Sequence, residues 1–272
     1  MKGKSYIKIY LENEYDKIIY YLLVYPSNFF IDANGQNQAD MKLVFHQYND
    51  FVNLLVNLGV KVQLLDITNS TEQVFTRDIG FVIKDIFFIS KLNNAQRQSE
   101  TEPLLSFIKT HNLKHYIMQN SIEGGDVILH DEVLFIGVSD RTSIEGIKEV
   151  QSVLDDNNIA VKTVPINFDR SKIHLDCVFN TLDRENCLIT DYVYDMDILQ
   201  KHIKNCFKLD KAAADELGTN FVYLGDKKIV TSSKGIYELL KSKGFTPYYT
   251  DFSEVIKGSG SLCCCTLPIL RL

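Results

Sequence analysis

The apolar positions of this chain recur in pairs of short segments, and each pair is followed by a longer stretch suited to a helix. In the first complete pair, residues 80–83 and 86–90 are almost wholly apolar and are separated by Lys84-Asp85. Two apolar runs joined by two polar residues are typical of a β-hairpin. Residues 96–111 then read as an amphipathic helix. The pattern predicts a unit of two strands and one helix.

The same unit recurs along the rest of the chain. Further hairpins are predicted at residues 126–137, 175–190 and 220–231. The helices that follow them are predicted at about 143–154, 195–205 and 234–243. Strands are expected after two of these helices, at 160–164 and 246–249. Successive units begin roughly 45 residues apart, a spacing that indicates a repeat architecture.

The two ends of the chain complete a fifth unit if they pair with each other. Residues 262–269 and 18–25 supply its two strands, 40–58 its helix and 60–65 its closing strand. Five such units predict an α/β fold in the form of a closed radial array. The alternative is an ordinary layered α/β fold whose spacing is accidental. No linker divides the repeat, so residues 1–272 are expected to form a single domain.

Composition narrows the partners that such a fold would bind. The 272 residues are 45% hydrophobic and 24% charged, with a formal net charge of -6, as in soluble globular proteins. The sequence has no cluster of Lys and Arg residues that would bind the phosphates of a nucleic acid. A small cationic ligand fits the net negative charge better. No apolar run reaches the roughly 20 residues of a membrane span, and no signal peptide is apparent. We expect a cytoplasmic protein without nucleic-acid or membrane partners, and both a monomer and a homodimer stay open.

The six cysteines follow neither a CxxC pattern nor a Cys/His zinc pattern. A disulfide scaffold is not expected at this length, and neither is a metal or another cofactor. Cys177, Cys187 and Cys206 are expected to be small buried side chains. The other three are adjacent, at Cys263, Cys264 and Cys265, just after a Gly/Ser run.

The chemically active residue types stand at one place in the repeat, where the first strand of a unit begins. They are Asp78, Glu123 with Asp126, His174 with Asp176, and Cys264. Equivalent strand ends in a pseudo-symmetric ring converge on its axis. We therefore expect these side chains to share one pocket.

Each of these residues also has a purely structural interpretation. Cys264 is either a nucleophile or a thiol in a C-terminal strand, where alternation points it away from Cys263 and Cys265. His174 is either a proton shuttle or a structural histidine, and Asp176 would share its face of a strand. Glu123-Gly-Gly-Asp126 is a ligand-binding turn in which the glycines permit positive φ, or a plain entry to a strand. Arg77-Asp78 is part of a site or an internal ion pair.

Taken together, four motifs resemble the guanidino-group-modifying enzymes of the pentein superfamily, which include arginine deiminases, dimethylarginine dimethylaminohydrolases and amidinotransferases. The motifs are Phe75-Thr-Arg-Asp78, Glu123-Gly-Gly-Asp126, His174-Leu-Asp-Cys-Val-Phe179 and Gly260-Ser-Leu-Cys-Cys264-Cys-Thr-Leu-Pro268. The resemblance covers nearly the whole chain. It implies a five-bladed α/β propeller of ββαβ modules, in agreement with the repeat.

The resemblance also implies roles for individual residues. Cys264 would be the nucleophile, His174 the acid and base, and Glu123 the carboxylate beside that histidine. Asp78 and Asp176 would bind the guanidinium, with Arg77 and Asp126 as further candidates. In its short length without an inserted domain, the chain resembles bacterial dimethylargininases. The motifs Phe-Thr-Arg-Asp and His-Leu-Asp, in contrast, are more similar to those of arginine deiminases.

The expected activity is a cofactor-free hydrolysis of a guanidino C–N bond, in arginine or a methylated arginine, through a Cys-linked thiouronium intermediate that yields a ureido product such as citrulline. The expected ligand is a small cationic guanidine. One alternative is an amidinotransferase, in which an amine intercepts the intermediate. Another is a non-catalytic pentein that serves as a binding module.

Overall fold

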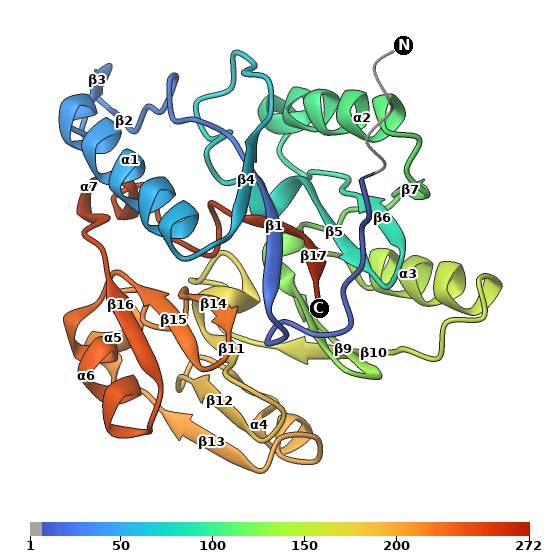
Figure 1. Ribbon diagram of the computed structural model, residues 1–272. Coiled ribbons are helices and arrows are strands. Elements are labelled where there is room, and N and C mark those ends of the chain that lie inside the picture. The colour runs from blue at the N-terminus through green and yellow to red at the C-terminus, as the bar shows by residue number, and fades with distance from the viewer. Residues whose placement is uncertain (1–6) are drawn as a thin grey trace.

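The predicted repeat is present as five three-stranded sheets in the computed structural model, which describes residues 7–272 (Figure 1). In every sheet the first strand is antiparallel to the second, and the second is parallel to the third. A helix connects the second strand to the third, because a parallel connection has to cross back over the sheet. Each module is therefore ββαβ.

The two ends of the chain meet in one sheet, as the repeat predicts. Strand β17 (Leu267–Arg271) pairs with β1 (Ile18–Leu23), and β1 pairs with β4 (Lys61–Leu64). Helix α1 (Met41–Asn57) joins β1 to β4, and Asp40 caps it by accepting from the backbone N–H groups of Lys42 and Leu43. The predicted fifth unit is confirmed.

The other four sheets follow in chain order. The second contains β5 (Gly80–Ile83), β6 (Ile86–Ile89), α2 (Thr101–Thr110) and β7 (His115–Ile117). The third contains β8 (Val127–His130), β9 (Val133–Val138), α3 (Ile144–Asp156) and β10 (Lys162–Asn167). The fourth contains β11 (Phe179–Thr181), β12 (Asn186–Ile189), α4 (Met196–Leu199) and β13 (Asn205–Lys208). The fifth contains β14 (Val222–Gly225), β15 (Lys228–Thr231), α6 (Lys234–Ser242) and β16 (Thr246–Tyr249).

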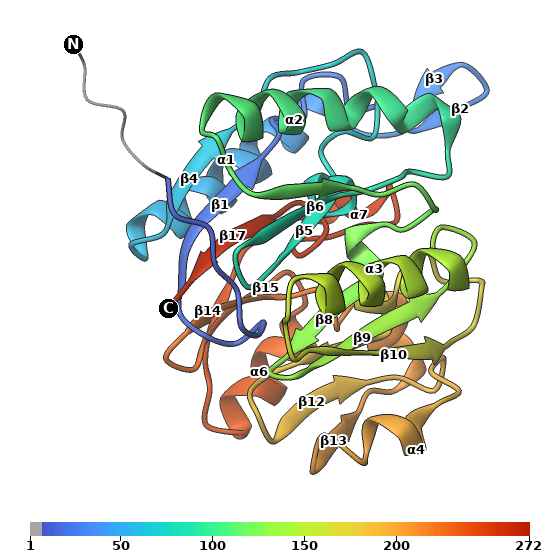
Figure 2. The ribbon, with the colours of Figure 1, turned by 90° about the vertical axis from the view of Figure 1, so that its right-hand side faces the viewer.

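The sheets follow one another around the middle of the molecule, and α1, α2, α3 and α6 lie at its periphery (Figures 1 and 2). This arrangement is consistent with the expected five-bladed propeller. First strands are fully buried, as in β5 and β8, whereas the third strands at the sheet edges are partly exposed. The first strands therefore face the interior, where the segments that precede them meet. Within residues 7–272 no helix is both long and apolar enough to cross a bilayer.

Three of the predicted elements are wrong in extent. The strand expected from residue 175 begins only at Phe179, because residues 175–177 form a 3-10 turn, so the expectation that His174 and Asp176 share one face of a strand is wrong. The helix expected over 195–205 is the single turn α4, because Cys206 and Phe207 continue into β13 and pair with β12. The strand expected from residue 262 starts only at Leu267, because Cys265 N–H donates to Ser261 and Thr266 N–H to Cys263. The three cysteines therefore lie in a turn. Strand alternation does not decide which way Cys264 points, and that part of the prediction is wrong.

Candidate active site

The segments just before the first strands bring the candidate residues together. Asp78 lies in the 3-10 turn η1 (Thr76–Ile79), Glu123 directly precedes η3 (Gly124–Asp126), and His174 directly precedes η4 (Leu175–Cys177). Asp78, His174 and Cys264 line a single pocket, although they come from different sheets. The convergence predicted from the repeat is confirmed for these three side chains.

The paired glycines of the Glu123 motif are needed for close packing. A Cβ on Gly124 would lie 2.1 Å from the Arg77 carbonyl oxygen, and a Cβ on Gly125 would lie 2.6 Å from Nδ1 of His174. Neither glycine has a positive φ, so the expected left-handed turn is wrong. The glycines instead let the His174 ring and the η1 backbone approach the third sheet.

His174 lies between two carboxylates. Its Nε2 is 2.8 Å from Oε2 of Glu123, and its Nδ1 is 3.6 Å from Oδ1 of Asp78. Burial alone would lower the pKa of His174, but the charge of Asp78 and the hydrogen bond to Glu123 outweigh it and raise that pKa well above 6.5. Burial would raise the pKa of Glu123, but the hydrogen bond to His174 and the positive charges nearby together outweigh burial, so the pKa of Glu123 is lowered from its usual value. The pair is therefore an imidazolium and a carboxylate.

Asp78 is held by an arginine that the sequence analysis did not single out. Arg97 Nη1 donates to Oδ2 of Asp78 at 2.9 Å, and the other side of its guanidinium is paired with Glu100. Oδ1 of Asp78 is buried and accepts no hydrogen bond within the described chain. This oxygen is therefore the free acceptor that Asp78 presents beside His174.

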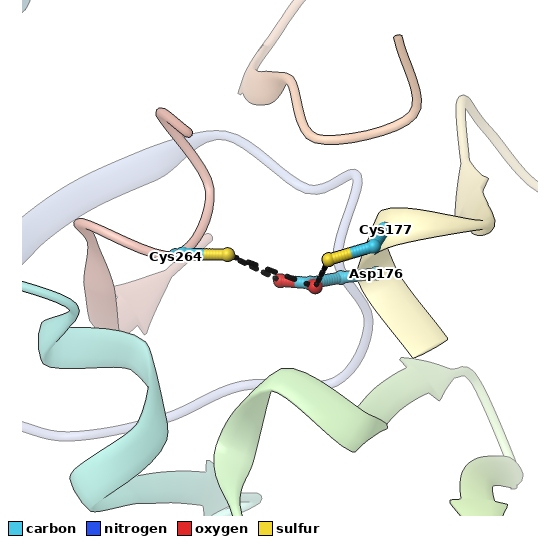
Figure 3. Close-up of side chains that lie close together, drawn as sticks. All are labelled: Asp176, Cys177 and Cys264. Carbon is cyan, nitrogen blue, oxygen red and sulfur yellow. Dashed lines mark hydrogen bonds between the residues drawn. The ribbon is translucent and has the colours of Figure 1, made fainter. Parts of the chain in front are cut away.

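The Sγ of Cys264 faces the carboxylate of Asp176. This Sγ lies 3.8 and 3.6 Å from the two carboxylate oxygens, and Sγ of Cys177 lies 3.4 Å from one of them (Figure 3). The neighbouring thiol of Cys177, burial and the charge of Asp176 raise the pKa of Cys264 well above 9. Burial likewise raises the pKa of Asp176. The empty site therefore holds Cys264 as a thiol.

The other two cysteines of the triplet point elsewhere. Cys263 lines a separate small cavity together with Glu14, Arg77 and Arg271. Cys265 is fully buried and packs in the apolar cluster beneath α1. Of the three thiols, only that of Cys264 lines the pocket of Asp78 and His174. Cys177 and Cys187 are buried, as predicted, whereas Cys206 is only partly buried.

Arg77 and Asp126 stand behind the pocket and not in it. The Arg77 guanidinium is paired with Glu14 at 2.7 Å and donates to the carbonyl oxygens of Gly124 and Val127. Asp126 accepts from the backbone N–H of Leu175 and the hydroxyl of Ser139. Its burial raises the pKa of Asp126 to about 6. These contacts tie neighbouring modules together beneath the site.

The pocket is nearly closed in this structure. Its remaining lining consists of Glu72, Phe75, Arg97, Arg141, Ile173, Gly258, Ser259 and Gly260. It leaves about 20 Å³ of free space, which is room for a single water molecule. A Cβ on Gly260 would lie 2.5 Å from the Phe75 ring, so residues 258–260 cover the pocket only because they lack side-chain bulk at that contact. A ligand larger than water requires this cover to move.

Among residues 7–272, two groups of three side chains have ligand atoms within 4.8 Å of one another: Asp78 with Glu123 and His174, and Asp176 with Cys177 and Cys264. In the first group the carboxylates already engage both ring nitrogens of His174. Local spacing in the sequence cannot detect such groups, because each combines residues from more than one module. The expectation of a cofactor-free site stays a prediction.

Two further residues at the site were missed for different reasons, one that lines the pocket and one that contacts Cys264. Arg141, whose Nη1 is 3.6 Å from Oε1 of Glu123, belongs to the loop after β9 and has no distinguishing motif. Asn220 donates to Sγ of Cys264 at 3.0 Å, and a signal for it was present. It stands just before β14, which is the position occupied by Asp78 before β5 and by Asp176 before β11. The fifth sheet was the one module to which the sequence analysis assigned no chemical residue.

Comparison with known proteins agrees with this architecture. A family model described as eukaryotic N,N dimethylarginine dimethylhydrolase matches residues 24–271. The protein YkgA of Bacillus subtilis is 32% identical over 283 aligned positions, which cover 98% of this chain and 97% of YkgA. The N(G),N(G)-dimethylarginine dimethylaminohydrolase of Mycobacterium tuberculosis is 24% identical, covering 92% of this chain and 83% of that protein.

A solved structure shares the fold. The N-terminal domain of ArgZ, an arginine dihydrolase from cyanobacteria, aligns with a TM-score of 0.84 at 19% identity, covering 93% of this chain and 98% of that one. The fold is that of the pentein superfamily. Within that superfamily, the chain belongs to the N,N dimethylarginine dimethylhydrolase family.

Proposed function

We propose that this protein is a hydrolase that cleaves a C–N bond of the guanidino group of arginine or a methylated arginine. The observation that carries the proposal is the single pocket shared by the Cys264 thiol, the protonated His174 and the free oxygen of Asp78. A nucleophile, a proton donor and an anionic acceptor are the groups that displacement of an amine from a guanidinium requires. The names of relatives, dimethylarginine dimethylaminohydrolase among them, support the same class of substrate.

The carboxylates would hold the substrate. A guanidinium is planar, and its N–H donors can bond to more than one carboxylate at once. Asp78 and Cys264 line the pocket, and Asp176 lies beside Cys264. Binding of a cation would offset the charge of Asp176, which now disfavours the thiolate. Substrate binding would therefore also activate the nucleophile.

The reaction would run in two displacements. When the cation binds, Cys264 releases its proton to solvent, and the thiolate forms a C–S bond to the central carbon. The amine leaves as it takes the proton from His174. Water then attacks the thiouronium carbon and gives a proton to the now neutral His174. The C–S bond breaks, which releases the ureido product and restores the thiolate. Glu123 stabilises the imidazolium at both stages through its bond to Nε2.

The amino-acid end of the substrate would meet a cationic side chain. Arg141 lines the pocket and its side chain is 25% exposed, whereas that of Arg97 is 3% exposed and paired with Asp78 and Glu100. Arg141 is thus the guanidinium at this wall that has capacity for a further anion. It would bind the α-carboxylate of arginine or a methylated arginine.

Product analysis tests the proposal directly. The protein is incubated with arginine, monomethylated and dimethylated arginines, and agmatine, and the ureido product and released amine are quantified, with Cys264→Ser as the matched control. Hydrolysis predicts equal amounts of both products, and the released amine identifies the bond that is cleaved. Transfer of the amidino group to an added amine without ureido product would instead indicate an amidinotransferase. Absence of turnover with all of these guanidines would contradict the proposal.

A further inference from the structure

Asn220 contacts Cys264 at two points. Its Nδ2 donates to Sγ at 3.0 Å, and its Oδ1 accepts from the backbone N–H of Cys264 at 3.2 Å. Asn220 is 1% exposed, so neither contact competes with bulk water. The Asn220 side chain thus both positions Cys264 and supplies a hydrogen bond to its sulfur.

The orientation of this amide follows from chemistry. The backbone N–H of Cys264 can only donate a hydrogen bond, so the atom that faces it has to be the carbonyl oxygen of Asn220. The opposite side of the amide is then the NH₂ group, which faces Sγ. The sulfur consequently receives a donor and cannot be facing an acceptor.

The backbone on both sides holds Asn220 in place. Its own N–H donates to the carbonyl of Leu217, and the carbonyl of Thr219 accepts from Nδ2 of Asn180. The hydroxyl of Thr219 donates to the backbone oxygen of Asp176 at 2.9 Å. The segment that carries the amide is therefore bonded to the residue that faces the thiol from the other side.

The rest of the surroundings disfavour a thiolate. The thiol of Cys177, burial and the carboxylate of Asp176 all raise the pKa of Cys264. Within residues 7–272, Asn220 supplies the one nitrogen donor that is hydrogen-bonded to Sγ. A hydrogen bond to the charged form of a group favours that form.

We propose that Asn220 is a catalytic residue, whose amide N–H stabilises the Cys264 thiolate and aims its sulfur into the pocket. The proposal rests on the proposed function only in taking Cys264 as the nucleophile. A donor on sulfur also makes the thiolate a weaker nucleophile, with a Brønsted coefficient of about 0.4–0.5. Because that loss is smaller than the gain in thiolate fraction, the net effect at neutral pH is acceleration.

Asn220→Asp is the decisive variant, since it is isosteric and keeps an oxygen to accept from the Cys264 backbone. It replaces the N–H donor at sulfur with an acceptor. The rate of Cys264 alkylation by iodoacetamide is measured against pH in the protein without substrate, with the adduct located by tandem mass spectrometry. We expect the midpoint of that profile to rise by about one unit. Alkylation below both midpoints should then be about three- to fourfold slower, because the roughly tenfold lower thiolate fraction is partly offset by the higher nucleophilicity of the more basic thiolate. This measurement needs no guanidine, so its outcome is independent of substrate identity.

Asn220→Ala and Asn180→Ala together distinguish loss of the Asn220 amide from general loosening of the segment that carries it. Asn220→Ala removes the donor without adding charge and should shift the profile in the same direction, which also covers the case in which Asn220→Asp does not fold. Asn180→Ala releases the neighbouring Thr219 carbonyl but leaves the amide on the sulfur, so its profile should shift less than those of the Asn220 variants. With a turned-over guanidine, kcat should fall more than KM rises in both Asn220 variants. An unchanged midpoint in the folded Asn220 variants, or an equal shift in Asn180→Ala, would overturn the proposal.

Discussion

His174 Nε2 and Glu123 Oε2 lie 2.8 Å apart, although the two residues are separated by 51 positions in the chain. Asp78 approaches the other ring nitrogen at 3.6 Å. Two carboxylates around one imidazole raise the pKa of His174, so the ring is charged at neutral pH. This arrangement makes His174 a proton donor at the start of the cycle, when the amine has to leave.

Glu123→Gln should therefore change the pH dependence of turnover as well as its rate. Removal of the carboxylate lowers the pKa of His174, so the imidazolium is lost at a lower pH. We expect the alkaline limb of the kcat profile to move to lower pH, and kcat near neutral pH to fall. Exposed Glu145→Gln is the control and should leave the profile unchanged. An unshifted alkaline limb in Glu123→Gln would argue against His174 as the acid.

The sequence predicted the modules and the convergence of Asp78, His174 and Cys264, because a repeat fixes which positions share the centre. It did not predict Arg97 or Arg141, since their positions depend on three-dimensional pairing with Asp78 and Glu123. One of its two arguments for Cys264, strand alternation, is wrong, because the turn at residues 262–265 is held by local backbone hydrogen bonds and not by a sheet. The other argument, the motif resemblance, does not depend on a strand there. The repeat could have identified Asn220 by its position before the first strand of its module. It was missed because asparagine is not a nucleophile or a titratable group.

Cys264, and neither Cys263 nor Cys265, should carry the covalent adduct of a haloacetamidine. Cys264 shares the pocket with His174, while Cys263 and Cys265 are directed to a separate cavity and to the apolar core. Tandem mass spectrometry of the C-terminal peptide locates the adduct. Cys264→Ser should abolish both labelling and turnover, whereas Cys187→Ser should retain both. Labelling mainly at Cys263 or Cys265, with Cys264→Ser still active, would refute the assignment.

Asp78→Asn and Asp176→Asn should each weaken guanidine binding by about 1–3 kcal/mol, the scale of a hydrogen bond to a charged group. They should differ in their effect on Cys264. The charge of Asp176 is adjacent to the thiol and raises its pKa, so Asp176→Asn should move the iodoacetamide profile of Cys264 to lower pH. Calorimetry and alkylation measure the two effects separately. Unchanged affinity and turnover in both variants would exclude a guanidine site here.

Arg141→Gln should discriminate between substrates that have and lack an α-carboxylate. If Arg141 binds that carboxylate, kcat/KM for arginine or a methylated arginine falls by about tenfold or more, on the scale of one charged hydrogen bond. Agmatine, which has no carboxylate, should be affected little. Arg170→Gln is a matched control, because Arg170 is an exposed neighbour that pairs with Asp140. Equal losses for arginine and agmatine would show that Arg141 does not recognise the carboxylate.

Asp126 should make the protein less stable as the pH rises from about 4 to about 6. Burial raises the pKa of Asp126 from 3.8 to about 6 in the folded protein, so across that interval the unfolded chain has released its proton while the folded one keeps it. The contribution of Asp126 to the free energy of unfolding is therefore complete below the lower value. It is lost as the pH passes through the higher one.

The size of this effect follows from the shift. A difference of about two units corresponds to on the order of 3 kcal/mol. Asp126→Asn mimics the protonated acid, because its oxygen can still accept from the Leu175 N–H while its NH₂ faces the Ser139 hydroxyl. Urea unfolding of both proteins between pH 4 and pH 7 measures the difference in stability. We expect the wild type to lose stability relative to Asp126→Asn as the pH rises, and exposed Asp197→Asn to follow the wild type. A difference that stays constant with pH would mean that Asp126 is already ionised at pH 4, and that its bonds to Ser139 and Leu175 outweigh its burial.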